Sequence, residues 1–197
     1  MAARELWEEG ATLCAQQGFK EPLARTSSWL AFALVEQGQC DEGIAKLRDA
    51  LDSSSDTWST GDRPFGLALL ALAQGKAGQA DQGLATIKDA LALANKIKKF
   101  GPLGYFYLSR GQLLLMKNRG ALRKAKQCFS TAIEIARKQN AKSDELSAAI
   151  PFARLLAQQG RREQARAMLA KIYNWFTEGF DTADLKEAKT LLDELSC

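Results

Sequence analysis

Apolar residues recur along the chain at the three- and four-residue spacing of amphipathic helices, and glycines, prolines and polar clusters separate these stretches. The longest polar cluster, DSSSDTWSTGD at 52–62, predicts the longest loop. The pattern predicts helices over 2–18, 21–37, 41–51, 64–76, 81–98, 102–117, 121–139, 144–159, 162–175 and 183–195.

Two of these stretches are near copies of each other. Residues 38–51 read GQCDEGIAKLRDAL and residues 78–91 read GQADQGLATIKDAL. Pro22, Pro64 and Pro102 open the first helices of successive pairs at a similar spacing. Because self-similarity at a period of a few tens of residues is typical of helical-repeat arrays, we predict an all-α fold. Its architecture would be a right-handed solenoid of antiparallel helical hairpins with an extra helix at each end.

The repeat predicts a single domain over residues 1–197. In the last hairpin we expect Ser143 to cap a helix that contains Pro151. Because proline removes a backbone hydrogen bond and clashes one turn back, we expect a kink there or a helix that begins later. The predicted parts are a leading helix at 1–20, hairpins at 21–60, 61–100, 101–141 and 142–177, and a capping helix at 181–197.

Composition narrows the classes of function. With 46% apolar and 25% charged residues, the chain should fold and be soluble. Glu5, Glu8 and Glu9 stand where a signal peptide needs an apolar run, and the four cysteines form no CxxC pair, so we expect a cytoplasmic protein with no membrane segment. The sequence has no histidine, which excludes Ser-His and Cys-His nucleophiles and histidine metal sites. We predict no enzymatic activity, no cofactor and no metal.

The small and large residues around the turns resemble the tetratricopeptide repeat (TPR), lengthened to about 40 residues. The third pair matches this pattern only if the turn near 118–122 is lengthened. The resemblance implies a scaffold that binds a protein or peptide. The signature positions of the first repeat are Leu30, Ala31, Leu34, Gly38, Gly43, Leu47 and Ala50.

A second resemblance lies at the C-terminal end. Residues 172–195, IYNWFTEGFDTADLKEAKTLLDEL, preceded by 128–149, look like the C-terminal region of a bacterial family of large predicted ATPases. Members often carry an adenylate/guanylate cyclase-type or DNA-binding domain at the N-terminus. The resemblance implies that this chain is the sensor or interaction end of such a regulator, since neither a P-loop nor a cyclase metal pattern occurs in it. Whether Met1 is a natural start or the chain is a fragment stays open.

On the TPR register, the first helix of each pair lines an inner groove. A mostly apolar groove with aromatic anchors and a few arginines suits a helix or an extended peptide. A closed pocket at Tyr105, Tyr107, Arg110 and Arg154 would instead favour a small-molecule effector sensor. The main candidates for partner contact are Arg25, Phe32, Phe65, Tyr105, Tyr107, Arg110 and Arg154. The other groove positions are Ser28, Val35, Ala68, Leu72, Leu108, Gln112, Ser147 and Ile150.

Basic residues concentrate in the middle of the chain. Residues 96–142 carry twelve lysines and arginines and one acid, Glu134, in a chain of net charge +4. The simplest interpretation is solvated helix faces that pair with the acidic ends of the same or a neighbouring molecule. An acidic protein partner is the next, and nucleic acid is the least favoured because no RNA-reading pattern accompanies the charge. The proposed basic patch consists of Lys117, Arg119, Arg123, Lys124 and Lys126.

The leading helix offers a candidate surface for self-association. Its exposed face would carry Leu6, Trp7, Leu13 and Cys14. Such a face could pair with another molecule, which gel filtration over a wide concentration range would detect.

Overall fold

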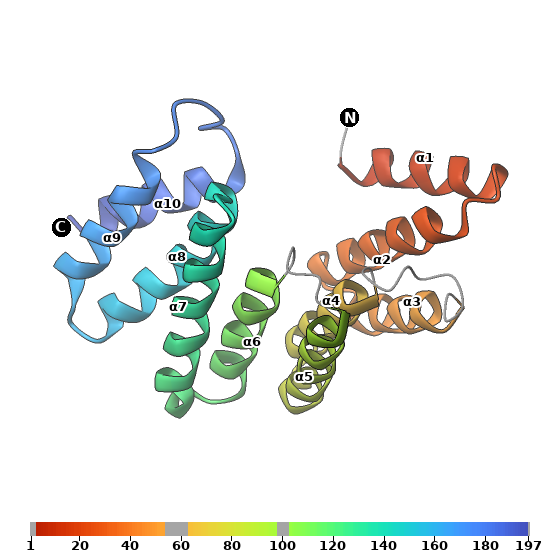
Figure 1. The fold of residues 1–197 in the computed structure, drawn as a ribbon, viewed down its shortest axis with the longest axis horizontal. Coiled ribbons are helices and arrows are strands. Elements are labelled where there is room, and N and C mark those ends of the chain that lie inside the picture. The colour runs from red at the N-terminus through yellow and green to blue at the C-terminus, as the bar shows by residue number, and fades with distance from the viewer. Residues whose placement is uncertain (1–2, 54–62, 98–102, 197) are drawn as a thin grey trace. The chain divides into compact units, whose positions relative to one another are not determined.

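The computed structural model describes residues 3–53, 63–97 and 103–196. Within these ranges the chain forms ten α-helices and one turn of 3₁₀ helix (Figure 1). The all-α prediction is therefore confirmed, and most helix bounds agree with the prediction within two residues. The helices are α1 (Ala3–Gln16), α2 (Lys20–Glu36), α3 (Cys40–Ser53), α4 (Arg63–Lys76), α5 (Ala80–Ile97), α6 (Leu103–Lys117), η1 (Arg119–Ala121), α7 (Leu122–Lys138), α8 (Lys142–Gln158), α9 (Arg162–Tyr173) and α10 (Ala183–Glu194).

The helices are grouped in two compact units, unit 1 (Met1–Pro102) and unit 2 (Leu103–Cys197). Within them, consecutive helices pack as antiparallel pairs, namely α2 with α3, α4 with α5, α6 with α7 and α8 with α9. This is the predicted hairpin organisation. The assignment of all 197 residues to a single domain stays a prediction.

The repeated sequence stretch marks a repeated turn. Gly38 and Gly78 both adopt the left-handed conformation, with φ of 86° and 79°. In the first turn the N–H of Gly38 donates to the carbonyl of Val35 and the N–H of Gln39 donates to that of Leu34. The second turn repeats both bonds. This is the Schellman arrangement, which satisfies the free carbonyls at a helix end and requires a residue that tolerates positive φ.

In the turn between α7 and α8, an asparagine adopts the left-handed conformation that glycine adopts in those two turns. This turn also shows that one prediction is wrong. Asn140 has φ of 55°, and the N–H of Ala141 donates to the carbonyl of Ala136. The chain therefore re-enters a helix almost at once, and α8 begins at Lys142 without a side-chain cap. The prediction that Ser143 caps this helix is wrong, because Ser143 already lies in its first turn.

Pro151 lies inside α8, which runs without a break from Lys142 to Gln158. The alternative that this helix begins later than the pattern indicates is therefore wrong. Since proline has no N–H, the carbonyl of Ser147, one turn earlier, receives no hydrogen bond from position 151.

Unit 1 is built around α2 and α4. α2 contacts α1, α3 and α4, and Leu47, Leu69 and Ile87 are fully buried in the core. Gly43 is in close contact with α2, since a Cβ placed there would lie 2.7 Å from the carbonyl oxygen of Ala31. Glycine at this position thus sets the spacing of the α2–α3 hairpin.

Neighbouring repeats of unit 1 are also joined on their surface. Lys76 at the end of α4 lies 2.8 Å from the carboxylate of Glu36 at the end of α2. The ring of Trp29 stacks on that of Trp7 with centroids 5.9 Å apart, and it lies 5.3 Å from that of Phe65. Aromatic contacts therefore link α1, α2 and α4.

Unit 2 is built around α8, which contacts α6, α7, α9 and α10. Its core contains Phe129, Leu146, Leu156 and Leu169, all almost completely buried. Gly111 of α6 lies directly against Phe129 of α7. This contact explains why the third pair keeps a small residue in its first helix.

A buried carboxylate fixes the α7–α8 turn. Glu145 is only 3% exposed, and its two carboxylate oxygens accept hydrogen bonds from Arg137 at 2.6 Å and from Lys142 at 2.8 Å. Burial alone would raise the pKa of Glu145, but the two cationic donors outweigh it and hold the pKa below its usual value. Arg137 and Lys142, two residues of the basic segment 96–142, thus pair with a carboxylate of the same unit.

Candidate functional site

A small pocket in unit 2 lies among the first helices of its two hairpins and the last helix, α10. α8 packs between α6 and α10, and the pocket has a volume of 220 Å³. Five of its lining residues are groove positions predicted from the sequence, and α10 adds two acids. The lining consists of Leu108 and Gln112 from α6, Ser147, Ile150, Pro151 and Arg154 from α8, and Asp184 and Glu187 from α10.

Helical spacing brings these side chains together. The four α8 residues occupy positions i, i+3, i+4 and i+7, which places them on one face of the helix. Leu108 and Ile150 are almost buried and form an apolar floor, whereas Arg154 and Glu187 are exposed at the rim. The predicted register of this hairpin face is therefore consistent with the observed pocket.

The rim of the pocket is polar and adjustable. Arg154 lies 3.3 Å from Glu187 and 3.8 Å from Glu194, and about half of each side chain is exposed. Ion pairs this exposed contribute little and exchange easily with other partners. Together with the hydroxyl and the carbonyl of Ser147, the rim offers several acceptors and one exchangeable cation to a ligand.

The other predicted contacts of unit 2 do not line this pocket. Tyr107 packs against the hydrophobic core of the unit, and the ring of Tyr105 lies 6.5 Å from that of Phe106. Arg110 is exposed, and its charge partly offsets the effect of burial, which raises the pKa of the Cys128 thiol. The pocket at Arg154 therefore lacks the other three residues of the small-molecule hypothesis.

In unit 1 the predicted groove face is largely closed. Val35, Ala68 and Leu72 are buried in the core, and Ser28 is 2% exposed with its hydroxyl donating to the carbonyl of Ala24. Three predicted contacts remain accessible on or beside this face: Arg25 is exposed, and Phe32 and Phe65 are half-buried.

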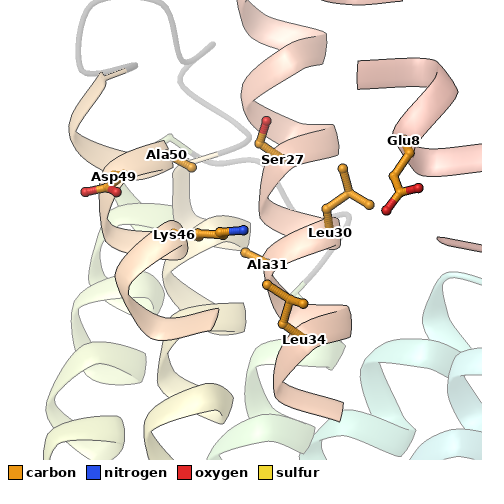
Figure 2. A pocket seen from close by; sticks show the side chains of 8 residues that line it. All are labelled: Glu8, Ser27, Leu30, Ala31, Leu34, Lys46, Asp49 and Ala50. Atoms are coloured by element: carbon orange, nitrogen blue, oxygen red, sulfur yellow. The ribbon is translucent and has the colours of Figure 1, made fainter. Parts of the chain in front are cut away.

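A larger hollow lies elsewhere in unit 1, among α1, α2 and α3 (Figure 2). Its volume is 470 Å³. Four of its residues, Leu30, Ala31, Leu34 and Ala50, occupy signature packing positions of the predicted repeat, so the hollow was not predicted. The 3–4 spacing of Ser27, Leu30, Ala31 and Leu34 was the available signal. The lining consists of Glu8 from α1, Ser27, Leu30, Ala31 and Leu34 from α2, and Lys46, Asp49 and Ala50 from α3.

The residues of the proposed basic patch differ in their surroundings. Lys117, Arg123 and Lys124 are exposed, and the side chain of Arg119 lies outside the described residues. Lys126 is half-buried, with its ammonium group 6.0 Å from the centre of the Phe152 ring. That distance is typical of a cation–π contact, so Lys126 has a structural partner as well as a charge.

Within the described ranges of the chain, no three histidine, cysteine, aspartate or glutamate residues lie close enough together to hold a metal ion. Within the same ranges, none of the helices combines the length and the apolar character needed to cross a bilayer.

Comparison with known proteins supports the class that this fold defines, a TPR-like repeat protein. No family model matches the chain, and no curated protein has a similar sequence. Two crystal structures of a Podosopora anserina protein, described as "putative kinesin light chain nearly identical TPR-like repeats", match with TM-scores of 0.66 and 0.67 (the latter for its Q17M variant). Both are 16% identical to this chain and cover 87% of it and 84% of the other chain.

The crystal structure of BtubC (BKLC) from P. vanneervenii matches with a TM-score of 0.70 at 15% identity and covers 100% of this chain and 91% of the other. At these identities the likeness shows the fold alone. The repeats thus resemble those of kinesin light chains, and the comparisons give no family link to ATPase or cyclase-type regulators.

Proposed function

We propose that the chain is a non-catalytic protein-interaction module and that the pocket among α6, α8 and α10 holds one side chain of a bound peptide. The observation that carries this proposal is the meeting of five predicted groove residues at one pocket of 220 Å³. Sites for drug-sized ligands and cofactors usually have volumes of about 300–1,000 Å³. The pocket is smaller than that range and suits one large side chain.

The lining indicates which peptide chemistry it would accept. An apolar floor at Leu108 and Ile150 favours an aliphatic stem, and the carboxylates of Asp184 and Glu187 favour a cationic or hydrogen-bond-donating end. The carbonyl of Ser147, which Pro151 leaves without its usual donor, adds an acceptor for a peptide N–H. A lysine or arginine side chain meets these requirements.

The test is selection of peptides from a random library on the immobilised full chain, followed by fluorescence anisotropy with selected sequences. Ser147→Leu would fill the pocket, and we expect it to weaken binding about tenfold or more, as loss of a central interface contact does. Gln158→Leu on the same helix introduces the same side chain at an exposed position outside the pocket and should leave binding unchanged. Equal affinities for the two variants would contradict the proposal.

Three finer aspects of function stay predictions. The prediction of no enzymatic activity rests on a sequence without histidine and without a recognisable constellation of acid, base, nucleophile or metal ligand. A link to an ATPase or cyclase rests on the resemblance of residues 128–195. Small-molecule sensing would need a pocket other than the one lined by Arg154, which lacks Tyr105, Tyr107 and Arg110.

A further inference from the structure

The hollow in unit 1 is a groove with α2 as its floor and α1 and α3 as its walls (Figure 2). We propose that this groove binds a short amphipathic helix of a partner protein, with lysine or arginine residues flanking its apolar face. The groove shares no residue with the positions predicted for the TPR groove on α2 or with the unit 2 pocket, so this surface is separate from the one proposed above.

The two walls are separate from each other. α1 and α3 both pack on α2, but among the described residues they do not contact each other. The floor residues Ser27 to Leu34 span about 10 Å of α2 at 1.5 Å per residue, which is two helical turns. A guest helix on this floor would lie about 8–10 Å from α2, the usual distance between packed helices.

The floor is apolar and incompletely covered. Ala31 and Ala50 are buried, whereas Leu30 and Leu34 remain half-buried although α1 and α3 both pack on this helix. Small residues beside accessible leucines leave room for side chains from a partner. Helix-in-groove recognition uses anchors at positions i, i+3, i+4 and i+7, the same spacing that the floor itself shows.

The charge of the rim determines the kind of partner. Glu8 and Asp49 line the groove, and a neighbouring hollow of 440 Å³ along α1 shares Glu8 and adds Glu5 and Glu9. Lys46, the basic residue in the lining, lies 2.9 Å from the carboxylate of Glu42. The rim is therefore acidic, which attracts a basic segment and repels acidic peptides and nucleic acid.

A second copy of this chain fits the groove less well. Its most basic helix is α7, but the apolar face of α7, including Phe129 and Ile133, is buried in the core of unit 2. A second copy would thus bring positive charge without the apolar anchors that the floor requires. A separate partner protein can supply both.

The test uses three synthetic helical peptides of about 15 residues, the length at which isolated helices become stable. The first carries leucines on one face and lysines elsewhere, the second replaces each lysine by glutamate, and the third shuffles the first so that its leucines share no face. With the full chain at physiological salt, we expect the first peptide to bind about tenfold or more tightly than the other two. Equal binding of the first and third peptides would overturn the proposal.

Variants and cross-linking locate the binding site. Leu34→Asp should weaken binding of the first peptide about tenfold, and Glu8→Lys with Asp49→Lys should weaken it about fivefold. The matched controls are Leu6→Asp on α1, outside the groove lining, and Glu134→Lys in unit 2, and both should leave binding unchanged. A photo-reactive group on the peptide should cross-link to residues of α2 and α3 in unit 1, and cross-links confined to unit 2 would overturn the proposal.

Discussion

The buried carboxylate of Glu145 provides the sharpest test of the structure of unit 2. Replacing it by glutamine keeps its shape but removes the charge that accepts hydrogen bonds from Arg137 and Lys142. The amide nitrogen of glutamine would also face one of the two cations, and a donor cannot accept a bond from another donor. The variant thus loses a charged hydrogen-bond acceptor and places two hydrogen-bond donors against each other at a buried position.

The size of the effect follows from burial. Removing one partner of a buried ion pair usually costs about 3–5 kcal/mol. Here the side chains of Arg137 and Lys142 are 51% and 31% exposed, so both can turn into water when the carboxylate is lost. We therefore expect Glu145→Gln to lower the free energy of unfolding of unit 2 by about 2–3 kcal/mol. That corresponds to a fall of about 10–20 °C in Tm for a unit of this size.

The pH dependence gives the prediction a second readout. Because the folded pKa of Glu145 lies below its usual value of about 4.3, this carboxylate contributes its full stabilisation above that pH. As the pH falls through the folded pKa, the unfolded chain binds more protons than the folded one and the contribution is lost. The difference in the free energy of unfolding between the wild type and Glu145→Gln should therefore be largest at about pH 6–7. It should shrink as the pH falls towards about 3.

Thermal unfolding followed by circular dichroism at both pH values measures these differences. Glu163→Gln is the matched control, because Glu163 also lies in the first turn of a helix but is exposed, and its effect should stay within about 0.5 kcal/mol. A Glu145→Gln variant as stable as the wild type at neutral pH would refute the reasoning. So would a difference that does not change with pH.

Two further predictions concern close packing in unit 2. Gly111→Ala should destabilise this unit by about 1–3 kcal/mol in urea unfolding, because the added Cβ would lie 2.8 Å from Cδ1 of Phe129. The control Gly104→Ala should be nearly neutral, because its Cβ would lie no closer than 3.5 Å to a neighbour, the carbonyl oxygen of Ala132; equal effects of the two variants would contradict the packing. Burial raises the pKa of the Cys128 thiol, so in the native protein iodoacetamide should modify Cys14 and Cys40 before Cys128 in peptide mass spectra; early labelling of Cys128 would show that this part of the core opens.

The sequence was sufficient to predict the helices because each boundary has a local cause. Glycines such as Gly38 and Gly78 adopt the left-handed conformation that ends a helix. A glycine that ends a helix, or a proline that opens one, does so whatever distant residues are present. The prediction of Ser143 as a cap was wrong because Asn140 can adopt the same turn as glycine, which composition alone did not reveal. The effect of Pro151 depends on packing around α8, so the helical pattern could not decide between the two alternatives.

The candidate sites were predicted less completely. Helical spacing identified the α6 and α8 residues of the unit 2 pocket, but the contribution of Asp184 and Glu187 depends on where α10 docks. The groove of unit 1 was missed because it depends on the distance between α1 and α3, two helices that share only α2 as a neighbour. Distances between non-adjacent helices leave no local trace in the sequence.

The ion pair between Glu36 and Lys76 shows a limit on how similar consecutive repeats can be. The two residues are 40 positions apart, so they occupy the same place in successive copies of the repeat, and stacking brings that place into contact with itself. Exact duplication of the unit would set two carboxylates or two ammonium groups against each other. Alternating the sign of the charge at this position therefore favours stacking, so divergence between the copies serves the array as well as reflecting drift.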